Sequence, residues 1–112
     1  MKKNIFQKEA KKAFLIELDE LKAFSKSKNF NVEELCSNIF KCKGKIFITG
    51  VGKSGHIANK ISATLSSTGT PSFFIHPAEA LHGDLGMIEK KDAILAISKS
   101  GESKEICDLI PA

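Results

Sequence analysis

Two turns rich in glycine and serine carry the residues best suited to chemistry on an anion. They are Gly50–Gly55 (GVGKSG) and Ser98–Ser103 (SKSGES), and each follows a short apolar run. Each turn also precedes a helical pattern, so backbone N–H groups, hydroxyls and a helix dipole converge where an anion can bind. We expect the two turns to hold a small phosphorylated ligand from two sides. A serine N-cap, at Ser100 or Ser103, is the simpler interpretation of the second turn.

The first turn is similar to two nucleotide-binding motifs but lacks a part of each. A dinucleotide-binding G-x-G-x-x-G turn needs an acidic residue about 20 positions later, and residues 70–76 (TPSFFIH) contain none. A P-loop needs a glycine where this chain has Phe47. We therefore expect no nucleotide cofactor. What is left is a tight strand-to-helix turn from which Lys53 projects, either toward a ligand or only into solvent.

Candidate proton-transfer groups lie close to these turns. Glu105 is expected on the first helical turn after Ser103, where it could act as a general base or simply favour the helix start. His82 lies in residues 76–86 (HPAEALHGDLG) and is expected to contact a sugar, to handle a proton or to fix an irregular loop. The spacing of His76 and His82 fits no standard zinc pattern, so we expect no metal. His56 is expected to be a surface residue at a helix start.

Hydrophobic periodicity predicts the elements that position these residues. Apolar residues spaced three and four apart predict helices over 5–27 and from Asn31 onward, with Gly44 ending the second helix at positive φ. Short apolar runs predict three strands, and the segments between them predict helices. The predicted strands are 45–49, 72–75 and 93–98; the predicted helices are 54–67 and 104–110, with 77–85 partly helical.

This alternation predicts an α/β fold, doubly wound, with three α-β-α layers around a parallel sheet. We expect residues 1–44 to form an N-terminal helical segment that packs on an α/β domain of residues 45–112. Three strands are fewer than the five or more that such domains usually contain. We therefore expect a sheet that is incomplete at the C-terminus, with an unpaired edge that favours aggregation.

Composition narrows the class of protein. The 17 basic residues are all lysines and the formal net charge is +4, and the absence of arginine argues against a nucleic-acid partner. Cys36, Cys42 and Cys107 form no C-x-x-C pair, and we expect Cys36 and Cys107 to be buried, inert thiols in a reducing compartment. No apolar run reaches the roughly 20 residues of a membrane span, and no signal peptide is recognisable. We expect a cytoplasmic protein with no membrane partner.

From about Lys45 onward the chain resembles the sugar isomerase (SIS) domain of arabinose-5-phosphate isomerases. The GVGKSG and SGES turns recur across SIS proteins, whereas HPAEALHGDLG is far more specific to this isomerase group. The resemblance implies a flavodoxin-like fold and the interconversion of D-ribulose 5-phosphate and D-arabinose 5-phosphate through an enediol, without a cofactor. It also implies a role in supplying Kdo for lipopolysaccharide or capsule, and a homo-oligomer, either a dimer or a tetramer.

The resemblance further implies roles for individual residues. Lys53, Glu105 and His82 match catalytic positions. The positions implied in phosphate binding are Gly52, Ser54, Ser98, Ser100, Gly101 and Ser103. Family members continue beyond residue 112 with more strands, further catalytic groups and often a pair of CBS modules, so we expect this chain alone to be inactive. A non-catalytic phosphosugar-binding SIS regulatory module is the alternative, since it needs the serines but not Glu105.

Overall fold

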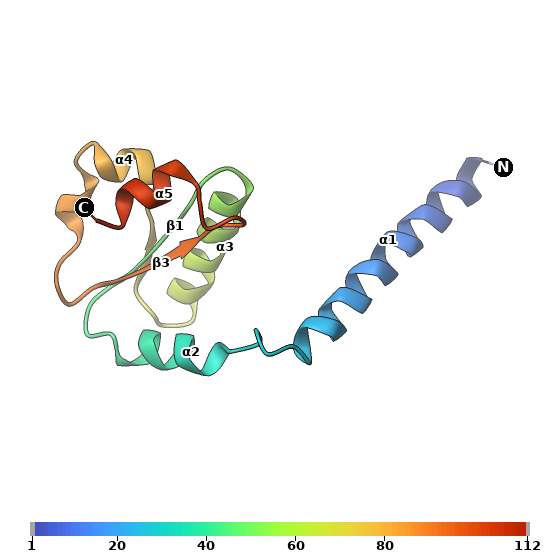
Figure 1. Cartoon of the computed structure of the whole chain (residues 1–112), viewed down its shortest axis with the longest axis horizontal. Helices are drawn as coiled ribbons and strands as arrows, with labels where there is room; N and C mark the ends of the chain where they lie inside the picture. Colours follow the sequence, from blue (N-terminus) through green and yellow to red (C-terminus); the bar gives the residue numbers. More distant parts are fainter. Residues whose placement is uncertain (1, 112) are drawn as a thin grey trace. The chain divides into compact units, whose positions relative to one another are not determined.

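The structure is a computed structural model that describes the backbone of residues 2–111 and the side chains of residues 4–111 (Figure 1). The chain divides into two compact units, Met1–Cys36 and Ser37–Ala112. The first unit contains the helix α1 (Lys2–Ser25) and the start of α2 (Val32–Lys41), so both predicted N-terminal helices are confirmed. Among the described helices, none is long and apolar enough to cross a membrane.

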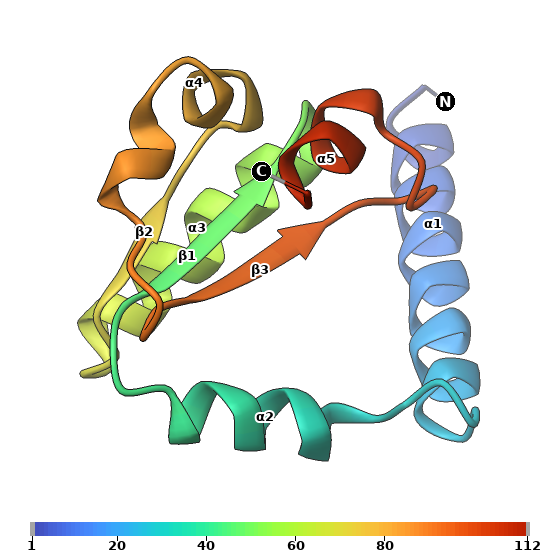
Figure 2. The ribbon, with the colours of Figure 1, turned by 60° about the vertical axis from the view of Figure 1, so that its left-hand side comes forward.

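The second unit is built on a three-stranded parallel sheet. The central strand β1 (Ile46–Gly50) lies between β2 (Ser72–Phe74) and β3 (Ala93–Ile97), as Figure 2 shows. Every residue of β1 is buried, because the strand has a neighbour on each side and helices on both faces. The three strands, their order of occurrence and their parallel pairing agree with the prediction from the apolar runs.

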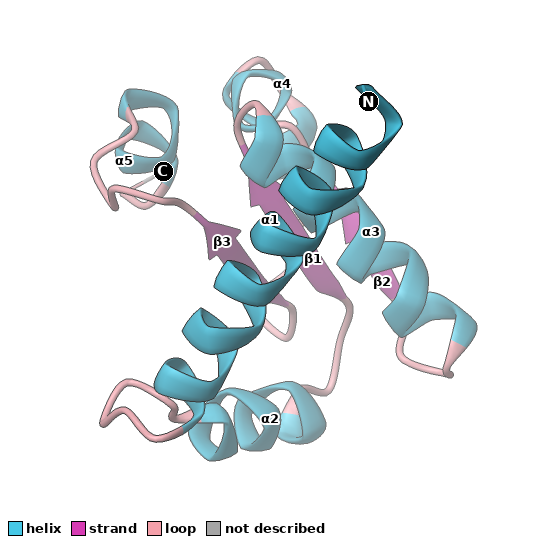
Figure 3. Cartoon of the chain, turned by 90° about the vertical axis from the view of Figure 1, so that its right-hand side faces the viewer, coloured by secondary structure: helices cyan, strands magenta, loops and turns pink. Residues whose placement is uncertain are grey.

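Helices cover both faces of this sheet (Figure 3). On one face α3 (Lys53–Ser67) packs against β1, where Ala58 joins Ile46 and Ile48 in one apolar cluster. On the other face lie α4 (Pro77–Leu81), the short 3₁₀ helix η1 (Asp84–Met87) and α5 (Lys104–Leu109). There Phe47 contacts a second cluster that includes Ala80 and Leu109. Since successive strand residues point to opposite faces, one short strand serves both clusters, and the predicted three-layer α/β fold is confirmed.

β3 is an edge strand of the described sheet. Its Ile94 is 45% exposed and Ala96 is exposed as well. An apolar groove of about 370 Å³ lies against this strand and is lined by Ile94, Ala96, Ile106, Leu109 and Ile110. Unpaired N–H and C=O groups along such an edge are a template for another strand.

Gly44 does not have the conformation predicted for it. In the described chain, positive φ occurs at Gly52, Gly69, Gly83 and Gly101, but not at Gly44. A Cβ at Gly44 would instead collide with the Asp92 carboxylate and lie 2.7 Å from the carbonyl oxygen of Lys91. Glycine is therefore needed here because two chain segments approach each other closely, and that approach is invisible to a local sequence pattern.

The expectation of buried thiols is also wrong, because both Cys36 and Cys107 are exposed. Cys36 lies on an apolar stripe of α2, but its neighbour Leu35 is 41% exposed, so that part of the stripe is uncovered in the described chain. Cys107 lies between the buried residues Ile106 and Leu109 of α5 and faces outward. Periodicity shows which residues share a face, whereas only the packing shows whether the face is covered.

Asp92 ties together the segments that precede β1 and β3. Its Oδ1 accepts a hydrogen bond from the backbone N–H of Lys45 at 2.7 Å, and its Oδ2 accepts one from the N–H of Glu89 at 2.8 Å. These two bonds, that from Glu89 first, lower the pKa of Asp92 because they favour the charged carboxylate. The stability that the carboxylate contributes is complete above its unfolded-state pKa and is lost as pH falls through its lower folded-state pKa.

We expect Asp92→Asn to lower the thermal unfolding midpoint at pH 7, because an amide presents only one oxygen to the two backbone donors. The variant should also lose less stability than the parent as pH falls below about 4, the ordinary carboxyl pKa. Melting curves followed by circular dichroism between pH 2 and 7 measure both effects. Asp84→Asn, at an exposed carboxylate, is the control. Parallel pH profiles for the parent and Asp92→Asn would contradict this prediction.

Candidate functional site

The sheet brings the two glycine- and serine-rich turns together. Gly50, the last residue of β1, is the register partner of Ile97, the last residue of β3. The turns therefore leave adjacent parallel strands at the same level of the same edge. The strand order β2-β1-β3 also reverses direction between β1 and β3, and in open α/β sheets ligands bind at the carboxyl edge at such a reversal.

The glycines of the first turn have two separate functions. A Cβ at Gly50 would lie 2.8 Å from the backbone of Ser54, and a Cβ at Gly55 would lie 2.6 Å from the carbonyl oxygen of Gly50. These two glycines therefore allow α3 to begin directly against the end of β1. Gly52 has open space around its Cβ position, but its φ of 59° is one that side-chain-bearing residues rarely adopt.

The start of α3 has the features of an anion site. No side chain caps the helix at Gly52, and in the described chain the backbone N–H groups of Lys53 and Ser54 have no hydrogen-bond partner. Lys53 is exposed and Ser54 is half-buried. Neither of the ion pairs found among the described side chains involves Lys53. A negatively charged group would therefore meet two N–H donors, a helix dipole and a lysine.

The second turn arranges its serines by hydrogen bonds within the turn. Ser98 Oγ accepts a bond from the Gly101 N–H at 3.0 Å and lies 3.3 Å from Ser103 Oγ, while Ser100 Oγ accepts from the Glu102 N–H at 3.1 Å. Gly101 makes the reversal possible with a φ of 72°. Each of these hydroxyls still has its own hydrogen to donate, since a hydroxyl is both donor and acceptor.

Ser103 occupies the N-cap position of α5, but its hydroxyl makes no capping hydrogen bond. Among the described residues, the N–H groups of Lys104, Glu105 and Ile106 also have no partner. Lys104 forms an ion pair with Asp108 at 2.7 Å, and this hydrogen bond raises the pKa of Lys104. The simple capping interpretation therefore gives Ser103 the right position but not the bond, and leaves the donors available.

The three catalytic candidates lie on three different helices. Lys53 begins α3, Glu105 lies in the first turn of α5, and His82 ends α4 as its C-cap residue. All three side chains are exposed. The structure thus brings Lys53 and Glu105 to helices that start at the same sheet edge. Among the described side chains, no hydrogen bond or ion pair joins His82 to either of them.

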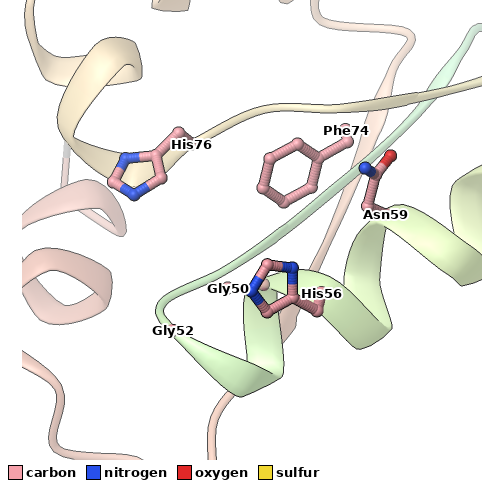
Figure 4. A pocket seen from close by; sticks show the side chains of 7 residues that line it. Gly50, Gly52, His56, Asn59, Phe74 and His76 are labelled. Atoms are coloured by element: carbon pink, nitrogen blue, oxygen red, sulfur yellow. The ribbon is translucent and has the colours of Figure 1, made fainter.

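A cavity that the sequence did not indicate lies at the carboxyl ends of β1 and β2 (Figure 4). It measures about 360 Å³ and is lined by Gly50, Gly52, Gly55, His56, Asn59, Phe74 and His76. His56 is exposed as expected, yet it also lines this cavity. The position of His76 directly after a predicted parallel strand was a usable signal, because that is the edge where ligands bind.

Thr49 is a second residue that sequence reasoning missed. It is fully buried on β1, next to the first turn, and its Oγ1 has no hydrogen-bond partner in the described chain. A buried hydroxyl without a partner is costly, so a water or another polar group suits this position. In the part of the chain that the structure describes, no three His, Cys, Asp or Glu side chains are grouped so that they could hold a metal ion.

These features define an α/β domain with an anion-binding edge, and comparison with known proteins gives its family. The family model of the SIS domain matches residues 39–112, and the chain belongs to this family. "Arabinose 5-phosphate isomerase KdsD" of Shigella flexneri is 52% identical over 106 residues, and "Arabinose 5-phosphate isomerase GutQ" of Salmonella typhi is 50% identical over 101.

Those alignments cover 95% and 90% of this chain but 32% of each relative, so the chain spans about a third of their length. Among solved structures, the protein c3406 of Escherichia coli CFT073, in complex with a phosphosugar, is similar with a TM-score of 0.79 and 47% sequence identity. That alignment covers 85% of this chain and 50% of the solved chain. The likeness therefore extends over most of this chain.

Proposed function

We propose that this chain supplies the phosphosugar-binding part of an arabinose-5-phosphate isomerase, which interconverts D-ribulose 5-phosphate and D-arabinose 5-phosphate. The observation that supports this most is the pair of turns at one sheet edge, with unpartnered N–H groups and three serines. They occur in a chain about half identical to proteins named for that activity. The site residues proposed for the phosphate are Gly52, Ser54, Ser98, Ser100, Gly101 and Ser103.

The reaction moves one proton between neighbouring carbons. A base removes the proton from the carbon next to the carbonyl, the electrons pass to the carbonyl oxygen, and an enediol results. Return of a proton to the former carbonyl carbon completes the isomerisation. We assign proton transfer or ring opening to Glu105 and stabilisation of charge on the oxygen to Lys53, with His82 contacting the sugar or handling a proton.

The phosphate site would contribute by orientation. A phosphate held by two turns of a rigid sheet edge fixes the direction in which the carbon chain leaves it, and such positioning accounts for a large part of many rate enhancements. We further propose that the product supplies Kdo synthesis for lipopolysaccharide or capsule, that the protein acts in the cytoplasm, and that it forms a homo-oligomer, either a dimer or a tetramer.

Activity assays on two proteins test the proposal. The first protein is this chain, which we expect to bind arabinose 5-phosphate but not to isomerise it. The second is a chimera in which this chain replaces the matching third of the Shigella flexneri relative, and it should interconvert the two pentose phosphates. Phosphosugar binding with no turnover in the chimera would favour a regulatory module. An absence of binding in both proteins would reject the phosphosugar site itself.

Ser98→Ala tests the phosphate site directly. Ser98 accepts the hydrogen bond from the Gly101 N–H and contacts Ser103, so its removal takes away one ligand donor and loosens the turn. We expect the affinity of this chain for both inorganic phosphate and arabinose 5-phosphate to fall about tenfold, as for the loss of one hydrogen bond to a charged group. Calorimetric titration measures it, with Ser67→Ala at the far end of α3 as the control. Equal affinities in the parent and Ser98→Ala would remove Ser98 from the site.

A further inference from the structure

The cavity between β1 and β2 has the chemistry of a site for a hydroxylated ligand. Its polar side chains come from two elements: His56 and Asn59 from α3, and His76 from the segment after β2. Figure 4 shows both histidine rings and the Phe74 ring around the same space. Sites for small molecules combine an apolar wall with a few placed polar groups, and here Phe74 and the glycine backbone form the apolar part.

Hydrogen bonding leaves the polar groups of this cavity available. His76 Nδ1 accepts a bond from the Ala78 N–H at 3.1 Å, which assigns the hydrogen of the neutral ring to Nε2 and makes that atom a donor. Among the described residues, the side chains of His56 and Asn59 form no hydrogen bond with any protein group. Together they offer donors and acceptors, which is what a row of sugar hydroxyls requires.

The position of the cavity connects it to the proposed phosphate site. Both share Gly52, since the first turn lies between the second turn on one side and the cavity on the other. Neighbouring strands are about 4.8 Å apart, so the end of β3 and the gap between β1 and β2 are separated by roughly 7 Å across the sheet. A phosphorylated five-carbon chain is long enough to cross the first turn from one to the other.

We infer that this cavity holds the hydroxylated carbon chain of the phosphosugar, and that His56 and Asn59 determine which sugar is accepted. The inference rests on the proposed function and adds a sugar site to it. It predicts two separable contributions to affinity. The turns recognise the phosphate in any ligand, whereas His56 and Asn59 act only on a ligand that carries a sugar.

Two probes separate these contributions, inorganic phosphate and D-arabinose 5-phosphate, each titrated calorimetrically into this chain. We expect His56→Ala to weaken arabinose 5-phosphate about tenfold, the loss of one polar contact, and to leave phosphate affinity unchanged. Lys60→Ala, an exposed change on the same helix outside the cavity, should alter neither. On the unmodified chain, arabinose 5-phosphate but not phosphate should shift the His56 ring resonances, which requires no variant to fold.

Each result has a definite meaning. Selective weakening of arabinose 5-phosphate, together with selective resonance shifts, supports the sugar site. Unchanged affinity for both probes in His56→Ala and unshifted ring resonances overturn it while the proposed function stands. Equal weakening of both probes also overturns it, because His56 would then act through the phosphate turns. If the unmodified chain binds neither probe, the proposed function fails and the sugar site fails with it.

Discussion

Glu105→Gln is expected to reduce isomerase turnover by about 10²- to 10⁴-fold, the usual contribution of a positioned proton-transfer group. Glu105 lies in the first turn of α5, immediately after the serine turn, and its carboxylate forms no ion pair with any described side chain. A carboxylate so placed can face a bound sugar, and glutamine keeps its size while removing its basicity. Turnover of arabinose 5-phosphate should be measured in the chimera of full relative length.

Substrate affinity should largely survive this change, because the phosphate is held by the turns and not by Glu105. Glu102→Gln is the matched control, since it makes the same chemical change at another exposed carboxylate of the same loop, and its turnover should be close to that of the parent. If Glu105→Gln retained full turnover, Glu105 would have no part in the mechanism. If it lost affinity and turnover together, its contribution would be to binding.

Gly50→Ala is expected to lower the free energy of unfolding by about 1–3 kcal/mol, the usual cost of forcing an extra carbon into a packed position. The new Cβ would lie 2.8 Å from the backbone of Ser54 and 2.9 Å from the Gly55 nitrogen. Backbone atoms in the first turn of a helix cannot move aside as a flexible side chain can. Either β1 or α3 must therefore shift, and the phosphate turn between them shifts with it.

Urea unfolding of this chain measures that loss, with Gly86→Ala as the matched control. A Cβ at Gly86 has no neighbour within 4 Å, and its φ is not among the positive ones, so the stability of this variant should be unchanged or slightly higher. Gly50→Ala should also weaken phosphate binding, because the N–H groups of Lys53 and Ser54 would be displaced. Equal unfolding midpoints for the two variants would show that α3 can move away at little cost.

Much of the α/β unit could be predicted because its signals are local. The apolar runs at Ile46–Gly50 and Ala93–Ile97 have no alternating pattern, which is typical of strands buried in a parallel sheet, and the structure places them so. Pro77 at the first turn of α4 and the glycines after β1 mark element boundaries in the same local way. The turns were recognisable for this reason, since loop, serine and helix start are contiguous in the chain.

The errors and omissions share a different cause. Gly44 approaches Asp92, which lies 48 positions later, and the sugar cavity joins α3 to the end of β2. Cys36 and Cys107 were expected inside because their residue type is often buried, but burial depends on what covers a face. None of these relations is contained in a window of neighbouring residues.

The amino-acid sequence by itself determined the order and type of the elements, the two anion-binding turns and the family to which they point, because these depend on short-range periodicity and turn chemistry. Tertiary structure alone decided that Gly50 and Ile97 stand opposite each other, which brings both turns to one edge. It also decided that His56, Asn59 and His76 share one cavity. The physical reason is that strand pairing and helix packing set distances between residues far apart in the chain, and such distances leave no periodic trace in the sequence.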